Sequence, residues 1–398
     1  MGSFFRYNLQ VRVVIFLFSL FFVFCGQAMA IVDPIATPNN KLGIHILFPD
    51  EVSKAANIVN DSQNGQWGYV VIPIQNIDRD RKKWQHFFDT CKDKKVIPII
   101  RVATTANGPH WELPSQFDLI DFANFLNDLD WPTKNRYVII LNEVNRNDEF
   151  GGKANPEQYA DFLNLAIDVF KGKSEDFFIL PAGLDNAAND PKNSIKWTTF
   201  LDRMHSHRSD IFSRIDGWNS HAYPNPDFSA RADLKGENKI SSFETDLNRL
   251  QKYTAKNLPV FITETGWSAK YLSEKQIGLY YQYALEKVWN HPQIVTVAPF
   301  LLDAKDGPFV PFSFLDKEGK EKEFVPYFSK YSSIGNPILP EPKKIPTPTS
   351  TNSSELAVAT TSSEVLAIEV DAGQKQSFFQ KIYNYLKSKI EDYVYNSR

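Results

Sequence analysis

Two glutamates stand at corresponding points of two apolar runs in this chain. Glu143 follows the run Tyr137–Asn142, and Glu264 ends the run Leu258–Glu264. Both runs have the composition of buried strands, and the carboxyl ends of parallel strands meet at one rim of a sheet. Cleavage of a glycosidic bond requires two carboxyl groups on one rim, and aromatic side chains beside them can stack on the sugar.

The elements that must position these glutamates are strand-like runs alternating with helix-like stretches. Most of the runs are short and continuously apolar, which is typical of strands buried on both faces. They are Leu42–Phe48, Trp67–Ile74, Val96–Val102, Tyr137–Asn142, Asp176–Gly183, Ile215–Tyr223, Leu258–Glu264 and Ile294–Leu302. Between them, apolar residues recur at spacings of three or four, as in Phe117–Leu129. Asn155 before Pro156 predicts a helix start.

This alternation over roughly 300 residues predicts an α/β fold, a single (β/α)₈ TIM barrel. The alternative is an open doubly wound sheet. We disfavour that alternative because no glycine-rich phosphate loop follows the first strand.

In a barrel of this kind, the carboxyl ends of the strands form the active-site rim. That rim would carry Arg101, Asn142, Glu143, His221, Tyr223, Glu264 and Trp267. The set resembles clan A of the glycoside hydrolases, whose two glutamates follow the fourth and seventh strands. The matching motifs are Asn142-Glu143, His221-Ala222-Tyr223 after the sixth strand, and Thr263-Glu264-Thr265-Gly266-Trp267 at the seventh. At the level of architecture, the resemblance covers about residues 40 to 335.

The resemblance implies a retaining double displacement on an oligo- or polysaccharide. Glu264 would be the nucleophile, and Glu143 would act first as the acid and then as the base. Tyr223 could donate a hydrogen bond to Glu264, and Asn142 could bind the sugar 2-hydroxyl. Substrate contacts are also expected from the following residues: Arg101, His221 and Trp267, and His110 and Trp111 of the loop Thr104–Trp111.

Three departures from the clan pattern concern the neighbours of these residues. Val144 stands where a proline usually follows the acid/base glutamate. Arg101 ends the third expected strand, whereas the clan arginine normally belongs to the second. The eighth run ends in Pro299–Leu302, where a tryptophan is common. These changes leave both glutamates in place, but they prevent the resemblance from identifying the substrate.

Both ends of the chain differ from the expected barrel. Residues 1–30 combine Arg6 and Arg12 with an apolar core and an Ala28-Met29-Ala30 cleavage signal, which predicts a signal peptide. The alternative is an uncleaved membrane anchor, and in either case we expect a secreted or cell-surface protein. The catalytic domain is expected over residues 31–336. A linker rich in proline, serine and threonine (337–376) should be disordered, and a short amphipathic helix (377–398) should follow, with possible membrane or cell-surface contact.

Composition and missing motifs narrow the function further. The net charge of −3 includes no dense basic stretch, so nucleic acid is not an expected partner. The chain has no His-Glu-x-x-His and no paired cysteines, so we expect neither a metal nor another cofactor. Loss of Cys25 with the signal would leave Cys91 without an intrachain disulfide partner. Two alternative functions remain open, namely a non-catalytic carbohydrate-binding protein and a cell-envelope scaffold.

Overall fold

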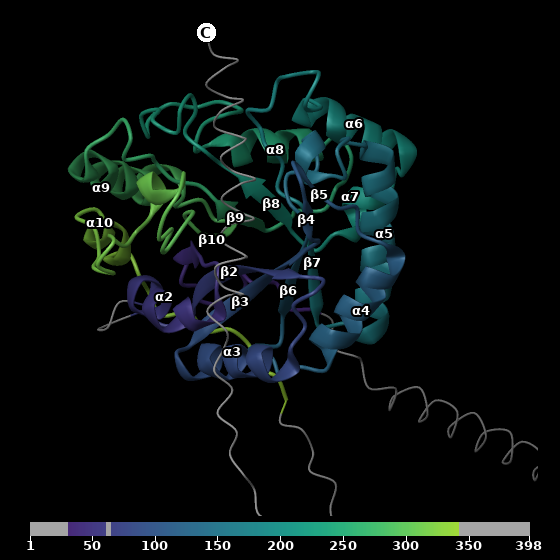
Figure 1. Cartoon of the computed structure of the whole chain (residues 1–398), viewed down its shortest axis with the longest axis horizontal. Coiled ribbons are helices and arrows are strands. Elements are labelled where there is room, and N and C mark those ends of the chain that lie inside the picture. The colour runs from purple at the N-terminus through teal and green to yellow at the C-terminus, as the bar shows by residue number, and fades with distance from the viewer. Residues whose placement is uncertain (1–30, 61–64, 342–398) are drawn as a thin grey trace, which may run out of the picture.

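The structure is a computed structural model, and it describes residues 31–60 and 65–341 (Figure 1). The predicted signal peptide and the predicted terminal helix lie outside the described residues, as does the predicted linker from residue 342 onward. No helix within 31–60 or 65–341 has the length and apolar character needed to cross a membrane.

Eight parallel strands form the barrel, in the order that the apolar runs predict. They are β1 (Gly43–His45), β2 (Gly68–Gln75), β3 (Val96–Ala103), β6 (Arg136–Ile140), β7 (Phe177–Pro181), β8 (Trp218–His221), β9 (Val260–Glu264) and β10 (Ile294–Val297). They pair in two arcs, β1-β2-β3-β6-β7 and β10-β9-β8. Single bridges from Leu42 to Val297 and from Asp185 to His221 join the two arcs. The sheet therefore closes on itself, which excludes the open doubly wound alternative and confirms the TIM-barrel prediction.

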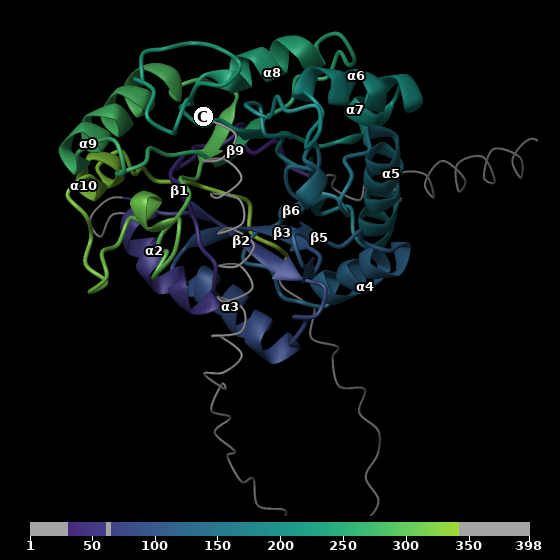
Figure 2. The same cartoon turned by 45° about the horizontal axis from the view of Figure 1, so that its top comes forward.

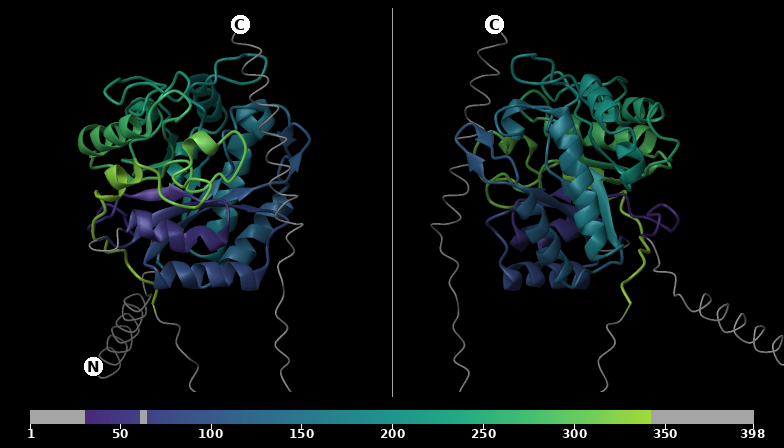
Figure 3. Two further views of the ribbon diagram at one scale, coloured as in Figure 1. Left: turned by 60° about the vertical axis from the view of Figure 1, so that its left-hand side comes forward. Right: turned by 90° about the vertical axis from the view of Figure 1, so that its right-hand side faces the viewer.

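A ring of helices surrounds the strands (Figure 2). It contains α2 (Val52–Val59), α3 (Arg81–Asp93), α4 (Gln116–Asn127), α5 (Pro156–Lys173), α6 (Trp197–His207), α7 (Ile211–Arg214), α8 (Ser242–Leu250), α9 (Glu274–Tyr283) and α10 (Val325–Ser329). The expected helix over Phe117–Leu129 corresponds to α4. Asn155 caps α5 as predicted, because its side chain accepts a hydrogen bond from Gln158 N at 3.1 Å. Figure 3 shows the barrel and its helices from two further sides.

Alternation along the strands divides the core into two layers. On β3, Ile97 and Ile99 point into the barrel, whereas Ile100 and Val102 pack against the surrounding helices. Arg101 continues the inward series at a spacing of two residues, so it reaches the carboxyl end of the barrel interior. The strand order makes β3 the third barrel strand. Arg101 therefore lies on the third strand, as the sequence predicts, one strand later than in the clan pattern.

The ordered contacts of the domain run slightly past the predicted boundary at residue 336. Lys134 N donates a hydrogen bond to Ile338 O at 2.8 Å, which ties the carboxyl-terminal segment to the start of β6. A domain ending at residue 341 keeps this contact.

Candidate active site

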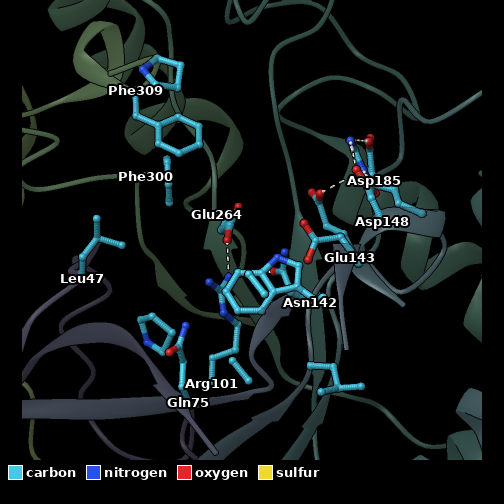
Figure 4. A pocket seen from close by; sticks show the side chains of 18 of the residues that line it. Leu47, Gln75, Arg101, Asn142, Glu143, Asp148, Asp185, Glu264, Phe300 and Phe309 are labelled. Atoms are coloured by element: carbon cyan, nitrogen blue, oxygen red, sulfur yellow. Dashed lines mark hydrogen bonds and ion pairs between the residues drawn. The ribbon is translucent and has the colours of Figure 1, made fainter. Parts of the chain in front are cut away.

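A cleft of about 1940 Å³ opens at the carboxyl ends of the strands. This volume exceeds the roughly 300–1,000 Å³ of a small-molecule pocket. Figure 4 shows Glu264 toward its middle, with Glu143, Asp148 and Asp185 on one side. Leu47, Phe300 and Phe309 lie on the other side. The cleft therefore has a polar arm that begins at Glu143 and an apolar arm, with Glu264 between them.

Glu143 and Glu264 meet in this cleft. One carboxylate oxygen of each, together with a ring nitrogen of His221, forms a group in which every pair of atoms lies within 4.8 Å. Glu143 follows the fourth barrel strand and has a positive φ of 33°. Glu264 is the last residue of β9, the seventh barrel strand. The fold thus places both carboxylates on one rim, with one oxygen of each within 4.8 Å of the other.

Glu264 is held in one orientation by two donors. Arg101 Nη1 donates to Glu264 Oε1 at 2.7 Å, and Tyr223 Oη donates to Oε2 at 3.0 Å. Arg101 Nη1 also donates to Asn142 Oδ1 at 2.8 Å, which links the two predicted motifs. Burial and the charge of Glu264 raise the pKa of Tyr223 well above its ordinary value, so its hydroxyl stays a donor. These contacts fix the orientation of the Glu264 carboxylate in the cleft.

Glu143 instead contacts a buried histidine. His221 Nδ1 lies 3.0 Å from Glu143 Oε1 and 3.8 Å from Glu264 Oε2. Burial lowers the pKa of His221, but the charge of Glu264 and the hydrogen bond to Glu143 outweigh it, so the net pKa is raised. The imidazole and Glu143 are within reach of a shared proton. The two glutamates therefore have different environments. Arg101 and Tyr223 orient Glu264, whereas Glu143 contacts the imidazole of His221.

Gly183, just after β7, leaves the space that His221 occupies. A Cβ at Gly183 would lie 2.1 Å from His221 Cδ2 and 2.3 Å from Nε2. Gly183 O also accepts a hydrogen bond from Glu143 N at 2.9 Å. This residue was not identified from the sequence, since nothing in DFFILPAG distinguishes its role.

We expect Gly183→Ala to lower the free energy of unfolding by about 1–3 kcal/mol, the usual cost of overpacking a core. The matched control is Gly172→Ala, where a Cβ meets nothing within 4 Å. Because Gly172 lies within α5, this control should stabilise the protein by up to about 1 kcal/mol. Urea unfolding measures both variants. Equal effects of the two substitutions would contradict the tight fit around His221.

His45 was also missed, although a polar residue in the apolar run LGIHILF is a visible signal. It is fully buried on β1, and its Nε2 lies 3.8 Å from Glu264 Oε1. Burial and the charges of Arg101 and His221 lower the pKa of His45 well below its ordinary value. The ring is therefore neutral and adds no second positive charge beside Glu264.

Trp267 is not in the cleft, which corrects the prediction that it contacts sugar. Its side chain is 2 % exposed and packs against Tyr280, Tyr281 and Trp289. Its indole Nε1 donates to Ala230 O at 2.8 Å. The chain turns away from the rim after Glu264, so the tryptophan fills the core behind the site.

Other aromatic side chains line the cleft instead. His110 and Trp111 form β5 (His110–Trp111), which pairs with β4 (Ala106–Asn107) in a hairpin at the cleft edge. Both residues are half-buried there, as a substrate contact requires. The remaining aromatic lining residues include Tyr223, Phe228, Tyr271, Phe300, Phe309 and Phe312. Phe300 stands in the expected eighth run, near the place where the clan pattern has a tryptophan.

The group of Glu143, His221 and Glu264 also has donors of the type that bind metals. Both oxygens of Glu264 already accept hydrogen bonds from Arg101 and Tyr223. The Arg101 guanidinium would repel a cation at this place. We therefore interpret the group as an acid–base cluster.

A buried glutamate supports the wall of the apolar arm. Glu51 Oε2 accepts hydrogen bonds from Leu47 N at 2.8 Å and Phe48 N at 3.0 Å. Burial raises the pKa of Glu51 to about 7, and the charge of Asp303 contributes to the rise. Its ordinary pKa is 4.5, so the folded state binds an additional proton between about pH 4.5 and 7.

This raised pKa predicts a stability contribution that is complete below about pH 4.5 and lost as the pH rises through about 7. The Tm of the wild type should therefore fall between about pH 4.5 and 7, and Glu51→Gln should lack the part of this fall that comes from Glu51. The control Glu318→Gln changes an exposed glutamate and should keep the wild-type decline. Thermal unfolding between pH 4 and 8 measures the difference, and identical curves for wild type and Glu51→Gln would contradict the prediction.

The closed barrel has the same fold as several solved glycoside hydrolase structures. The structure is similar to a glucosidase from Croceicoccus marinus, with a TM-score of 0.55, 10% identity, and coverage of 75% of this chain and 68% of that one. It is also similar to a GH5_18 protein from Streptomyces cattleya in complex with Manb1-4GlcNAc, with a TM-score of 0.53, 12% identity, and coverage of 73% and 80%.

A third similar structure is a family 39 glycoside hydrolase from the gut symbiont Bacteroides cellulosilyticus WH2. The TM-score is 0.51 at 15% identity, and 76% of this chain aligns with 65% of that enzyme's length. At these identities the likeness shows a shared fold. No protein-family model and no curated protein sequence matches the chain.

Proposed function

We propose that this protein is a retaining glycoside hydrolase that cleaves O-glycosidic bonds in an oligo- or polysaccharide. The observation that carries the proposal is the unequal carboxylate pair. A carboxylate oxygen of Glu143 lies within 4.8 Å of one of Glu264, and the two side chains have different partners. Retaining enzymes need this short spacing, and they need one carboxyl group that carries a proton while the other is ionised.

In the first step, Glu264 attacks the anomeric carbon as the bond to the leaving oxygen breaks. The Glu143 carboxyl donates its proton to that oxygen, and a glycosyl ester of Glu264 forms. In the second step, Glu143 takes a proton from water, whose oxygen bonds to the anomeric carbon as Glu264 leaves. The two inversions restore the original configuration. Arg101 and Tyr223 hold Glu264 ready for attack, and Asn142 is placed to bind the 2-hydroxyl.

The two arms of the cleft favour a chain substrate over a single sugar. The leaving group must extend along the polar arm, because Glu143 protonates its oxygen. The glycosyl unit bound by Glu264 then faces the apolar arm, where Phe300 and Phe309 offer ring faces and edges to sugar C–H groups. Sites on both sides of the glutamates support cleavage within a chain.

The test is a screen of the mature protein against plant and microbial glycans, followed by ¹H NMR of the first products. We expect the anomer formed first to have the configuration of the substrate, and we expect products longer than a monosaccharide. Inversion at the anomeric carbon would overturn the retaining mechanism. Release of monosaccharide alone would overturn cleavage within a chain.

A carbohydrate-binding protein without turnover is the alternative function. A binder has no need for a doubly hydrogen-bonded Glu264 beside a second carboxyl group. Secretion or attachment to the cell surface belongs to the proposal through the predicted signal peptide, and membrane contact through the predicted terminal helix.

Deletion of residues 342–398 should leave turnover of a soluble substrate within about twofold of the intact protein. The physical reason is that the barrel and all the rim residues lie within residues 31–341. Initial rates of the two proteins on the same substrate provide the measurement. A scaffold whose function depends on its tail would instead lose that function, and a large fall in rate would show that the tail contributes to the site.

A further inference from the structure

Arg146 forms ion pairs with three carboxylates that line the cleft, those of Glu143, Asp148 and Asp185. Figure 4 shows these three carboxylates on the polar arm. Arg146 Nη1 is 2.7 Å from Asp185 Oδ2, and Arg146 Nε is 3.3 Å from Asp148 Oδ1. The same Nε is 3.9 Å from Glu143 Oε2, beyond hydrogen-bonding distance. The guanidinium thus hydrogen-bonds the two aspartates, whereas its ion pair with Glu143 Oε2 is longer.

Asp185 is fixed in place by its surroundings. Its Oδ1 accepts hydrogen bonds from Ala187 N at 2.9 Å and Ala188 N at 3.0 Å, so only Oδ2 serves Arg146. The buried side chain of Asn145 donates to Asp185 O and accepts from Asp185 N, both at 3.0 Å. Asn145 therefore clamps the loop after β7 to the loop that carries Glu143 and Arg146. These two hydrogen bonds with Asn145 fix the backbone position of Asp185, which pairs with Arg146 at 2.7 Å.

We propose that Asp185, together with Asp148, holds Arg146 away from Glu143 and thereby lets Glu143 keep the proton it must donate. The inference rests on the proposed function, in which Glu143 is the acid. A close ion pair between an arginine and a carboxylate stabilises the ionised form and removes the proton at lower pH. Asp185 is a positioning residue in this account, since it acts through Arg146.

The other groups that face Glu143 come from two neighbouring strands. His221 contacts it from β8, Tyr223 lies just past β8, and Glu264 faces it from β9. Within the part of the chain that the structure describes, no hydrogen bond or ion pair joins Arg146 to His221, Tyr223 or Glu264. Burial and the charge of Glu143 raise the pKa of Asp185, and Arg146 opposes the rise. Asp185 therefore also interacts directly with the charge of Glu143, an effect separate from its hold on Arg146.

Two substitutions should shift the pH dependence in opposite directions. Asp185→Asn keeps the oxygen that accepts from Ala187 and Ala188 but removes the charge that binds Arg146. Arg146 then loses its ion pair with Asp185 and can move toward Glu143, and the alkaline limb of kcat/KM should move down by about one pH unit. Arg146→Gln removes the cation, and the limb should move up. The matched control is Asp227→Asn, an exposed carboxylate on the cleft lining outside this cluster, which should leave the limb in place.

A second readout does not depend on turnover. Protein labelled with ¹³C at glutamate carboxyl carbons can be titrated by NMR, with the Glu143 signal assigned by its loss in Glu143→Gln. We expect its midpoint to fall in Asp185→Asn and to rise in Arg146→Gln. Unchanged midpoints, or shifts in the same direction, would overturn the inference. The double variant Asp185→Asn/Arg146→Gln separates a direct charge effect from an effect through Arg146. If Asp185 acts through Arg146, adding Asp185→Asn to Arg146→Gln should shift the midpoint much less than Asp185→Asn does alone, and an equal shift would overturn the inference. If Asp185→Asn does not fold, Asp148→Asn, which removes the other aspartate partner of Arg146, takes its place in this comparison. Inactivity on every glycan would count against the proposed function, but the NMR titration of Glu143 would still test the inference.

Discussion

Glu264→Ala should lower turnover of a confirmed substrate by roughly 10⁶-fold, the scale seen when an enzyme loses its nucleophile. Glu264 is the carboxylate that Arg101 and Tyr223 orient, and no other carboxylate takes its place on β9. Initial rates at saturating substrate measure the loss. Unfolding by urea should be recorded in parallel, because the substitution leaves Arg101 without one of its partners.

Azide or formate should restore part of the lost activity in Glu264→Ala. A small anion can enter the space left by the side chain and attack the anomeric carbon directly. The azide product should have the opposite anomeric configuration, because only one displacement then occurs. A rate near that of the wild type, or rescue with retained configuration, would contradict the assignment of Glu264 as the nucleophile.

Glu143→Ala should lower turnover of natural glycans by roughly 10²- to 10⁴-fold, the range that general acid catalysis contributes. Its effect should depend on the leaving group. Substrates with a good leaving group need no protonation, so their first step should stay fast and the glycosyl ester should accumulate. Stopped-flow measurement of leaving-group release would show this as a burst.

Glu149→Gln is the matched control for this second prediction, because Glu149 lines the same cleft but belongs to η2 (Asn147–Glu149), outside the pair. Its rates should stay close to those of the wild type on both kinds of substrate. An equal loss on natural and activated substrates in Glu143→Ala would indicate a binding defect instead of a lost acid.

The barrel could be predicted from the sequence because its signals are local. A buried parallel strand needs a short apolar run, and a helix needs apolar residues at spacings of three and four. Asn155 illustrates the same point, since its cap depends on a residue three positions away. The two glutamates followed from this reasoning, because the ends of parallel strands share one rim in any closed barrel.

Only the tertiary structure decided how deeply each rim residue lies and which side chains face it. Trp267 belongs to a matching motif, yet the backbone after β9 directs it into the core. Arg146 and Asp185 are 39 positions apart in the chain, and they meet because neighbouring loops are clamped together. Contacts of this kind depend on loop paths and packing between distant segments, which local spacing does not encode. The sequence by itself determined the barrel and its carboxylate pair, whereas the folded chain determined the partners that give each carboxylate its environment.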